Sequence, residues 1–306
     1  MKLLGGKFGT FGNLLVFLSI LLIFVILFNI LFGDALNNKE GFEQKDKVVI
    51  KEGPDVYDDF YVSVYDNLSF SKLKNDFEVG QIINTTKPTT ESKILDIGSG
   101  TGHHVAQLSS KNIPTIGVDV SNYMVSKAKE TYPKEKFIKG DVNNSSLFSP
   151  NSFTHITCLY FSIYYFKDKM TFFNNCMTWL MPGGYLVVHI VDRDRFDPIL
   201  PPSNPLLIVS PQKYAKQRIT QSEVVFNNMQ YKAEFALEPG SDNAVFKEKF
   251  MGNNNKVRKN KHIFTMEDEK KIVAMAKEAG FIVQGKIDMV KVGYEYQYLY
   301  IFVKPS

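Results

Sequence analysis

Three acidic residues and a glycine-rich turn are the groups in this 306-residue sequence whose types and spacing suggest chemistry. Asp96 precedes the turn 98–102 (Gly-Ser-Gly-Thr-Gly), and Asp119 and Asp141 follow two further apolar segments. Glycines permit positive φ angles and let a ligand approach the backbone closely. An acid at the end of the second strand can accept hydrogen bonds from both hydroxyls of a ribose. The pattern therefore predicts a site that binds a ribose.

Alternating strand-like and helix-like segments must position these acids. Apolar segments at 93–97, 115–118, 136–138, 154–159 and 185–191 predict strands, and 56–77, 103–110, 122–131 and 169–180 predict helices. This rhythm is typical of a doubly wound α/β domain with a mostly parallel sheet. Because the carboxyl ends of its strands meet at one edge, where such sheets bind ligands, the three acids are expected to converge there.

The segments ILDIGSGTG (94–102), GVDVSNYM (117–124) and GDV (140–142) together resemble the class I S-adenosylmethionine-dependent methyltransferases, in particular their small-molecule, type 11-like branch. The resemblance covers about residues 57–305. It implies a methyltransferase (EC 2.1.1.-) that uses S-adenosyl-L-methionine. It also implies a Rossmann-like, seven-stranded sheet in the order 3-2-1-4-5-7-6, with strand seven antiparallel.

The resemblance also implies roles for individual residues. Asp96 and the glycines would surround the methionine part of the cofactor, Asp119 would bind ribose, Met124 would cover adenine, and Asp141 would meet the adenine amino group. The candidate cofactor-binding residues are Tyr57, Tyr61, Tyr65, Asp96, Gly98, Ser99, Gly100, Thr101, Gly102, Asp119, Val120, Met124, Asp141 and Val142. Thr154 stands where the family often has an aspartate, which puts one supporting contact in doubt.

Two other functions remain open. A dinucleotide-binding oxidoreductase requires G-x-G-x-x-G, but position 103 is histidine, and Gly102 lies one place early, which suits a cofactor without a pyrophosphate. A catalytically inactive cofactor-fold scaffold at a membrane is the second alternative. Calorimetry distinguishes it, because a scaffold that binds no cofactor gives no heat.

His189, near the carboxyl end of the fifth strand, is the candidate catalytic base for an acceptor that must lose a proton. The alternative is a structural strand histidine. The tyrosines of segment 56–77 could form a lid whose ring faces contact a sulfonium, or simply a packing face. Cys158 and Cys176 lie in no Cys-x-x-Cys pair, and no metal site is predicted.

Outside the core, three further segments have distinct compositions. The 19 residues 14–32 carry no charge and are long enough to cross a bilayer as a helix, although a cleaved signal peptide competes with this interpretation. Residues 34–54 predict a polar stalk, which places the methyltransferase domain at 55–306. Residues 192–262 predict a β-rich substrate-cover insertion, in which the basic cluster 256–262 meets an anionic substrate or lipid headgroup, or forms a solvated loop.

The net charge of +4 argues against nucleic acid as a partner. The predicted partners are the lipid bilayer, through residues 14–32, and an unidentified methyl acceptor that is a small molecule, a lipid-like molecule or a protein. Basic residues nearly tie on the two sides of the predicted span, so they do not set its orientation. Because the cofactor is cytosolic, a single-pass protein with a cytosolic catalytic domain is expected. The sequence leaves the acceptor and the oligomeric state open.

Overall fold

The structure is a computed structural model, which describes residues 18–19, 21, 48–198, 217–226, 229–252 and 256–306. The chain divides into two compact units, residues 1–43 and 44–306, and the elements below belong to the second unit. No helix among the described residues is long and apolar enough to cross a membrane. The predicted span 14–32 lies outside the described residues, apart from Leu18, Ser19 and Leu21.

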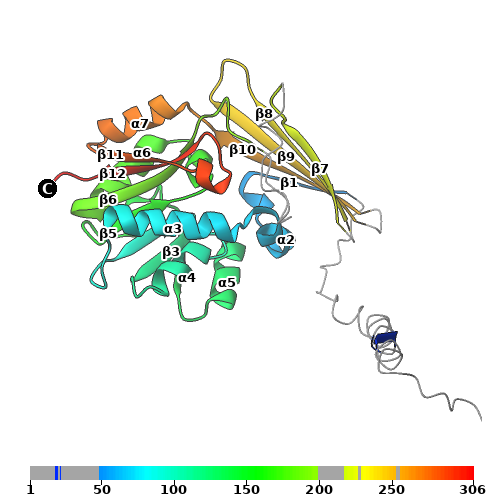
Figure 1. The fold of residues 1–306 in the computed structure, drawn as a ribbon. Coiled ribbons are helices and arrows are strands. Elements are labelled where there is room, and N and C mark those ends of the chain that lie inside the picture. Colours follow the sequence, from blue (N-terminus) through cyan, green and yellow to red (C-terminus); the bar gives the residue numbers. More distant parts are fainter. Residues whose placement is uncertain (1–17, 20, 22–47, 199–216, 227–228, 253–255) are drawn as a thin grey trace, which may run out of the picture. The chain divides into compact units, whose positions relative to one another are not determined.

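A seven-stranded sheet forms the centre of the second unit (Figure 1). Its strands lie in the order β11-β12-β6-β5-β2-β3-β4, which in sequence numbering from the β4 edge is 3-2-1-4-5-7-6. The five strands from β4 to β6 are parallel, and β12 runs antiparallel to both of its neighbours. The strands are β2 (Ile94–Ile97), β3 (Thr115–Asp119), β4 (Lys136–Lys139), β5 (Phe153–Cys158), β6 (Leu180–Val191), β11 (Ile282–Asp288) and β12 (Gln297–Val303).

Helices cover both faces of this sheet. In Figure 1, α6 and α7 lie on one face and α3, α4 and α5 on the other. The helices are α2 (Asp59–Ser69), α3 (Lys72–Thr86), α4 (His103–Ser109), α5 (Asn122–Thr131), α6 (Lys169–Trp179) and α7 (Glu269–Glu278). Short 3-10 turns are η1 (Gly53–Val56), η2 (Ser145–Leu147), η3 (Ser162–Tyr165) and η5 (Val290–Val292). The layered α/β architecture predicted from the sequence is present.

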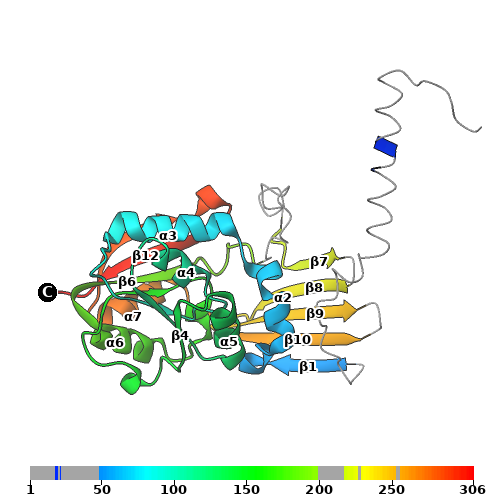
Figure 2. The same cartoon turned by 90° about the horizontal axis from the view of Figure 1, so that it is seen from below.

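A second, five-stranded sheet, four of whose strands follow β6, extends beyond the carboxyl ends of the parallel strands (Figure 2). Its order is β1-β10-β9-β8-β7, formed by β1 (Val48–Glu52), β7 (Gln221–Val225), β8 (Met229–Leu237), β9 (Asn243–Gly252) and β10 (Val257–Thr265). One face packs on α2 and η3, through contacts such as Phe60 against Phe250 and Tyr165 against His262. The β-rich insertion expected after the fifth strand is therefore a sheet that lies against the parallel core. Residues 199–216 of this insertion lie outside the described residues.

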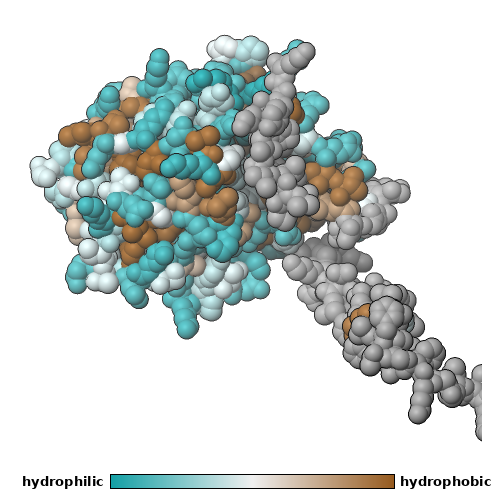
Figure 3. All heavy atoms as spheres, viewed as in Figure 1, coloured by the Kyte–Doolittle hydropathy of each residue, from teal (hydrophilic) through white to brown (hydrophobic). Residues whose placement is uncertain are grey.

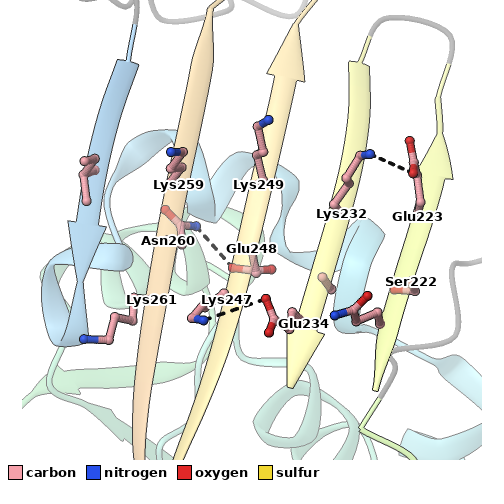
Figure 4. A pocket seen from close by; sticks show the side chains of 13 residues that line it. Ser222, Glu223, Lys232, Glu234, Lys247, Glu248, Lys249, Lys259, Asn260 and Lys261 are labelled. Carbon is pink, nitrogen blue, oxygen red and sulfur yellow. Dashed lines mark hydrogen bonds and ion pairs between the residues drawn. The ribbon is translucent and has the colours of Figure 1, made fainter. Parts of the chain in front are cut away.

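The other face of the five-stranded sheet is a shallow, charged hollow of about 700 Å³ (Figure 4). Lys232 pairs with Glu223 at 2.8 Å, and Lys261 pairs with Glu52 at 2.7 Å. These exposed ion pairs between neighbouring strands keep this face polar. The view of the second unit in Figure 3 likewise shows hydrophilic side chains interspersed with apolar ones, the normal surface of a globular domain.

Three sequence predictions about segments need correction. The helix predicted over 56–77 is split, because Ser71 caps a new helix by accepting a hydrogen bond from the Lys74 amide at 3.3 Å. The end of the predicted stalk is β1, which pairs in parallel with β10, so the folded domain begins before residue 55. The rest of the stalk, up to residue 47, lies outside the described residues.

The third correction concerns the basic cluster 256–262, which falls largely in β10 rather than in a loop. Alternation along the strand sends Arg258, Asn260 and His262 into the interior and leaves Lys259 and Lys261 on the outer face. A sequence read by its charges alone cannot distinguish these two sets. The two cysteines, Cys158 and Cys176, are free and buried.

Candidate active site

The three predicted acids follow three neighbouring parallel strands. Asp96 lies in β2, Asp119 ends β3, and Asp141 comes two residues after β4. The Gly140 amide donates to the Asp119 carbonyl at 3.0 Å, which brings the start of the Asp141 loop against the end of β3. Parallel pairing of β2 with β3 and of β3 with β4 therefore places all three residues at the same edge of the sheet.

The glycine turn connects β2 to α4 and is folded as its sequence requires. Gly98, Gly100 and Gly102 have φ angles of +69°, +53° and +92°, a region that residues with a side chain rarely adopt. A Cβ atom at Gly98 would clash with the Ser162 side chain, and one at Gly102 would lie 2.6 Å from the Phe137 ring. The turn is thus both left-handed and packed closely against its neighbours.

Asp119 joins β3 to this turn. Its carboxylate accepts hydrogen bonds from the amide of Gly100 at 3.0 Å and from the amide of Ser121 at 2.8 Å. Burial raises the pKa of Asp119, and these two amides partly offset that effect. Each carboxylate oxygen keeps a second lone pair, so the group can still accept hydrogen bonds from a ribose.

Asp96 and Asp141 have contrasting environments. Asp96 is buried and accepts a hydrogen bond from the Thr157 hydroxyl at 2.7 Å, and burial raises its pKa. Asp141 is exposed and accepts from the Asn143 amide at 2.9 Å. Asp96 therefore anchors β2 to β5, whereas Asp141 offers its carboxylate at the surface.

The remaining predicted cofactor residues differ in exposure. Val120 is 56% exposed at the end of β3, whereas Met124 and Val142 are buried. The Ser99 hydroxyl is buried without a hydrogen-bond partner among the described residues. The Thr101 hydroxyl donates to Asp66 at 2.7 Å. Their contacts with a cofactor stay predictions.

The three predicted tyrosines lie near the turn. Tyr57 and Tyr65 are partly buried, Tyr61 is buried, and their rings are edge-on to one another with centroids 5.5 to 6.4 Å apart. The Tyr57 carbonyl accepts a hydrogen bond from the Ser121 hydroxyl at 3.1 Å, and the Tyr65 ring lies 3.9 Å from the Cβ position of Gly100. The segment that carries these tyrosines therefore contacts both the Asp119 loop and the glycine turn.

His189, the predicted base, is fully buried in β6. Its Nδ1 lies 2.7 Å from the Tyr160 carbonyl oxygen, and its Nε2 has no hydrogen-bond partner among the described residues. Burial, reinforced by the charge of Lys74, lowers the pKa of His189 to about 4. It is therefore neutral near pH 7, and its role as a base stays a prediction.

A buried polar cluster beside His189 was not predicted. Lys74 and Glu78, one turn apart on α3, form an ion pair at 2.7 Å with side-chain exposures of 6% and 0%. His104 approaches Glu78 at 2.8 Å, and the Lys74 ammonium lies 4.6 Å from the centre of the Tyr160 ring. Burial alone would raise the pKa of Glu78, but the Lys74 charge and the His104 hydrogen bond lower this pKa to about 2. In the sequence, Lys and Glu four residues apart are typical of a solvated helix face, so no signal marked them.

The site fits the cofactor that the sequence resemblance implied. The left-handed turn lets a ligand touch the backbone, the Ser99 hydroxyl lacks a partner within the described part of the chain, and Asp119 has free lone pairs. Across the described ranges, no group of three or more His, Cys, Asp or Glu side chains is arranged to hold a metal ion. Asp119, Ser99 and the turn glycines would hold the ligand, and the three tyrosines would border it.

Comparisons with known proteins agree with this interpretation of the site. The family model described as "Methyltransferase domain" matches residues 95–188. A curated relative, the dTDP-4-amino-2,3,4,6-tetradeoxy-D-glucose N,N-dimethyltransferase of Saccharopolyspora spinosa, is 28% identical over 144 residues. That match covers 45% of this chain and 57% of the relative, so the chain spans little more than half the length of the curated protein that it matches.

Solved structures show the same fold. An S-adenosylmethionine-dependent methyltransferase from Clostridium acetobutylicum is 18% identical, with a TM-score of 0.62 over 80% of this chain and 98% of that one. CalS10, an amino pentose methyltransferase from Micromonospora echinaspora, is 15% identical, with a TM-score of 0.54 over 81% of this chain and 98% of that one. In its fold and in the match over residues 95–188, this domain is similar to S-adenosylmethionine-dependent methyltransferases. The matched residues 95–188 contain the glycine turn, Asp119 and Asp141.

Proposed function

We propose that this protein methylates an amino nitrogen of a sugar-like small molecule. The observation that carries the proposal is the Asp119 carboxylate, which is hydrogen-bonded to the glycine turn at the edge where the parallel strands end. An amine acceptor is supported by the curated relative, which is named as an N,N-dimethyltransferase of a dTDP-linked amino sugar. The five-stranded sheet, which packs on α2 and η3, supports an acceptor enclosed between two layers of the domain.

The bound cofactor supplies a methyl group that is already activated for displacement, so the chain chiefly orients the acceptor and excludes water. The tyrosines beside the turn are suited to both tasks, because their rings are apolar and their faces attract a positive charge. A neutral nitrogen is the attacking form of an amine. A group of the chain that takes up the nitrogen's proton would keep the nitrogen in this neutral form.

The test uses purified full-length protein. Calorimetry with S-adenosylmethionine is expected to show binding at one site, and incubation with dTDP-4-amino-2,3,4,6-tetradeoxy-D-glucose is expected to give product heavier by one or two methyl groups in mass spectra. A folded protein that releases no heat with the cofactor would contradict the proposal and favour the scaffold. Cofactor binding with transfer to hydroxyl acceptors instead of amines would contradict the amine acceptor.

Anchoring of the domain to a bilayer through residues 14–32, with the domain on the cytosolic side, belongs to this proposal. It is supported by the 19-residue stretch without a charged side chain. Membranes from cells that express the full chain, extracted at alkaline pH, are expected to retain the protein, as they retain integral proteins. Complete release into the supernatant would contradict the anchor.

A further inference from the structure

A continuous chain of hydrogen bonds runs from the inner face of the five-stranded sheet to the tyrosines beside the glycine turn. Tyr57 donates its hydroxyl hydrogen to the Tyr165 oxygen at 2.6 Å, and the Tyr165 hydroxyl lies 2.9 Å from His262 Nδ1. On the far side of the ring, His262 Nε2 lies 2.8 Å from Glu248 Oε2. Four side chains from η3, β9, β10 and the end of η1 are thereby linked.

The inner end of this chain is a fixed, buried carboxylate. Glu248 is 2% exposed, and its oxygens also accept from the Tyr231 hydroxyl at 2.8 Å and the Asn260 amide at 3.2 Å. Arg258 in turn donates to Asn260 and to Asp58. Burial of an unpaired carboxylate costs free energy of folding. If this layer served only for packing, apolar residues in these positions would make the protein more stable.

The hydrogen-bond directions agree with transport of a proton. Glu248 can only accept from a neutral imidazole, which places the hydrogen of His262 on Nε2 and leaves Nδ1 as the acceptor for Tyr165. Tyr165 then donates to Nδ1 and accepts from Tyr57. The Tyr57 oxygen keeps a lone pair for a further donor, and this residue contacts the Asp119 loop through its carbonyl.

This inference rests on the proposed function. We propose that Tyr57 takes the proton from the amine acceptor, and that Tyr165 passes a proton on to His262, where the Glu248 carboxylate balances the positive charge. The lone pair of the acceptor nitrogen forms a bond to the methyl carbon while the carbon–sulfur bond breaks. The electron pair of the broken bond stays on sulfur. The nitrogen's proton passes to the Tyr57 oxygen. Tyr57 gives its own proton to Tyr165, Tyr165 gives one to Nδ1, and the product is a neutral amine with an imidazolium beside Glu248.

This arrangement avoids a tyrosinate. Burial raises the pKa values of Tyr57 and Tyr165 well above the ordinary tyrosine value, so each hydroxyl must gain a proton as it loses one. Among the described residues, the titratable groups that face His262 are Glu248, Tyr165, Tyr57 and Tyr61, and beyond Glu248 lie Tyr231, Asn260 and Arg258. Glu248 is the anion in contact with the ring, and Arg258 reaches it only through Asn260.

The first experiment compares the wild type with Tyr165→Phe, which keeps the ring and breaks the chain. With dTDP-4-amino-2,3,4,6-tetradeoxy-D-glucose as the probe, the variant is expected to lose about 100-fold in kcat with little change in KM, as removal of a proton acceptor does. The solvent deuterium isotope effect on kcat that proton transfer along this chain produces is expected to disappear. His155→Gln is the matched control, because His155 is a buried strand histidine bonded to Thr86 and Thr154 and outside this chain.

The second experiment requires no turnover. Long-range proton–nitrogen NMR spectra of the full chain are expected to show His262 with hydrogen on Nε2 and none on Nδ1, and calorimetry is expected to show unchanged cofactor affinity in Tyr165→Phe. A hydrogen on Nδ1 would overturn the relay, as would a Tyr165→Phe variant that keeps the wild-type kcat and solvent isotope effect. A wild type that never methylates the amine probe refutes the proposed function instead, and the NMR result then decides the relay.

Discussion

The carboxylate of Asp119, at the end of β3, accepts a hydrogen bond from the amide of Gly100, in the turn after β2, at 3.0 Å. This hydrogen bond fixes the loop after β3 against the turn after β2, at the edge where the ribose is expected to bind. The same carboxylate also accepts a hydrogen bond from the Ser121 amide, and the Ser121 hydroxyl donates a hydrogen bond to the Tyr57 carbonyl. One acid therefore connects the turn, the helix that follows β3 and the tyrosine segment.

Replacement of Asp119 by alanine is expected to weaken cofactor binding strongly. Hydrogen bonds to a charged group contribute about 1.5–3 kcal/mol each, so loss of the ribose contacts is expected to raise the Kd for S-adenosylmethionine by a factor of about 30 or more. Calorimetry at pH 7 measures the Kd of both proteins. Glu130→Ala, an exposed acid on α5, is the control and is expected to keep the wild-type Kd. Equal affinities for the wild type and Asp119→Ala would refute the ribose role.

Two glycines are expected to respond in opposite ways to alanine. At Gly102, φ is +92° and the new Cβ would meet Phe137, so Gly102→Ala is expected to lower the free energy of unfolding by about 2–4 kcal/mol. At Gly80, inside α3, nothing lies within 4 Å of the Cβ position. Gly80→Ala is expected to raise the free energy of unfolding by about 0.5–1 kcal/mol. Urea denaturation measures both, and equal shifts would contradict this account.

Lys74 and Lys72 offer a matched comparison of ion pairs on one helix. Lys74→Met leaves Glu78 buried and without its ammonium partner, so a loss of about 3–5 kcal/mol in unfolding free energy is expected. Lys72 pairs with Asp76 at the same spacing, but their side chains are 81% and 44% exposed. Lys72→Met is expected to cost less than about 0.5 kcal/mol. If denaturation gave equal losses for both variants, the buried pair would have no special role.

The sequence predicted the parallel core because its signals are local. An apolar segment that contains Asp96 and continues into three alternating glycines specifies a strand, a left-handed turn and a helix within a dozen residues. The same reasoning placed Asp119 at the edge next to that turn. These features require no knowledge of what packs on them.

The rest of the site depends on contacts between distant segments. Glu248, His262 and Tyr165 meet because β9 and β10 pair in a sheet that lies on η3, and nothing near His262 in sequence marks it as buried. The same holds for Glu78, whose partners include His104, 26 residues further along the chain. A basic cluster and a charged helix face are ordinary surface patterns, and only the tertiary fold turns half of their residues inward.

His189 is expected to make the protein less stable in mild acid. Its pKa is about 4 in the folded state, whereas an unfolded histidine titrates near 6.5, so below pH 6.5 the unfolded state binds a proton that the folded state does not. The free energy of unfolding is expected to fall as pH drops from 6.5 to 4, by a total of about 3 kcal/mol from this residue. Glu78 acts in a lower window, because its lowered pKa costs stability only as pH falls from about 4.3 toward 2.

Urea denaturation of the wild type and His189→Gln at several pH values between 7 and 4 separates the His189 contribution. The variant is expected to lose less stability with acid, with a slope smaller by up to about 1.4 kcal/mol per pH unit, whatever its stability at pH 7. Glutamine keeps a polar side chain but cannot titrate, so the slope and not the absolute stability is diagnostic. Parallel pH curves for the two proteins would show that His189 takes up its proton equally well in the folded and the unfolded state.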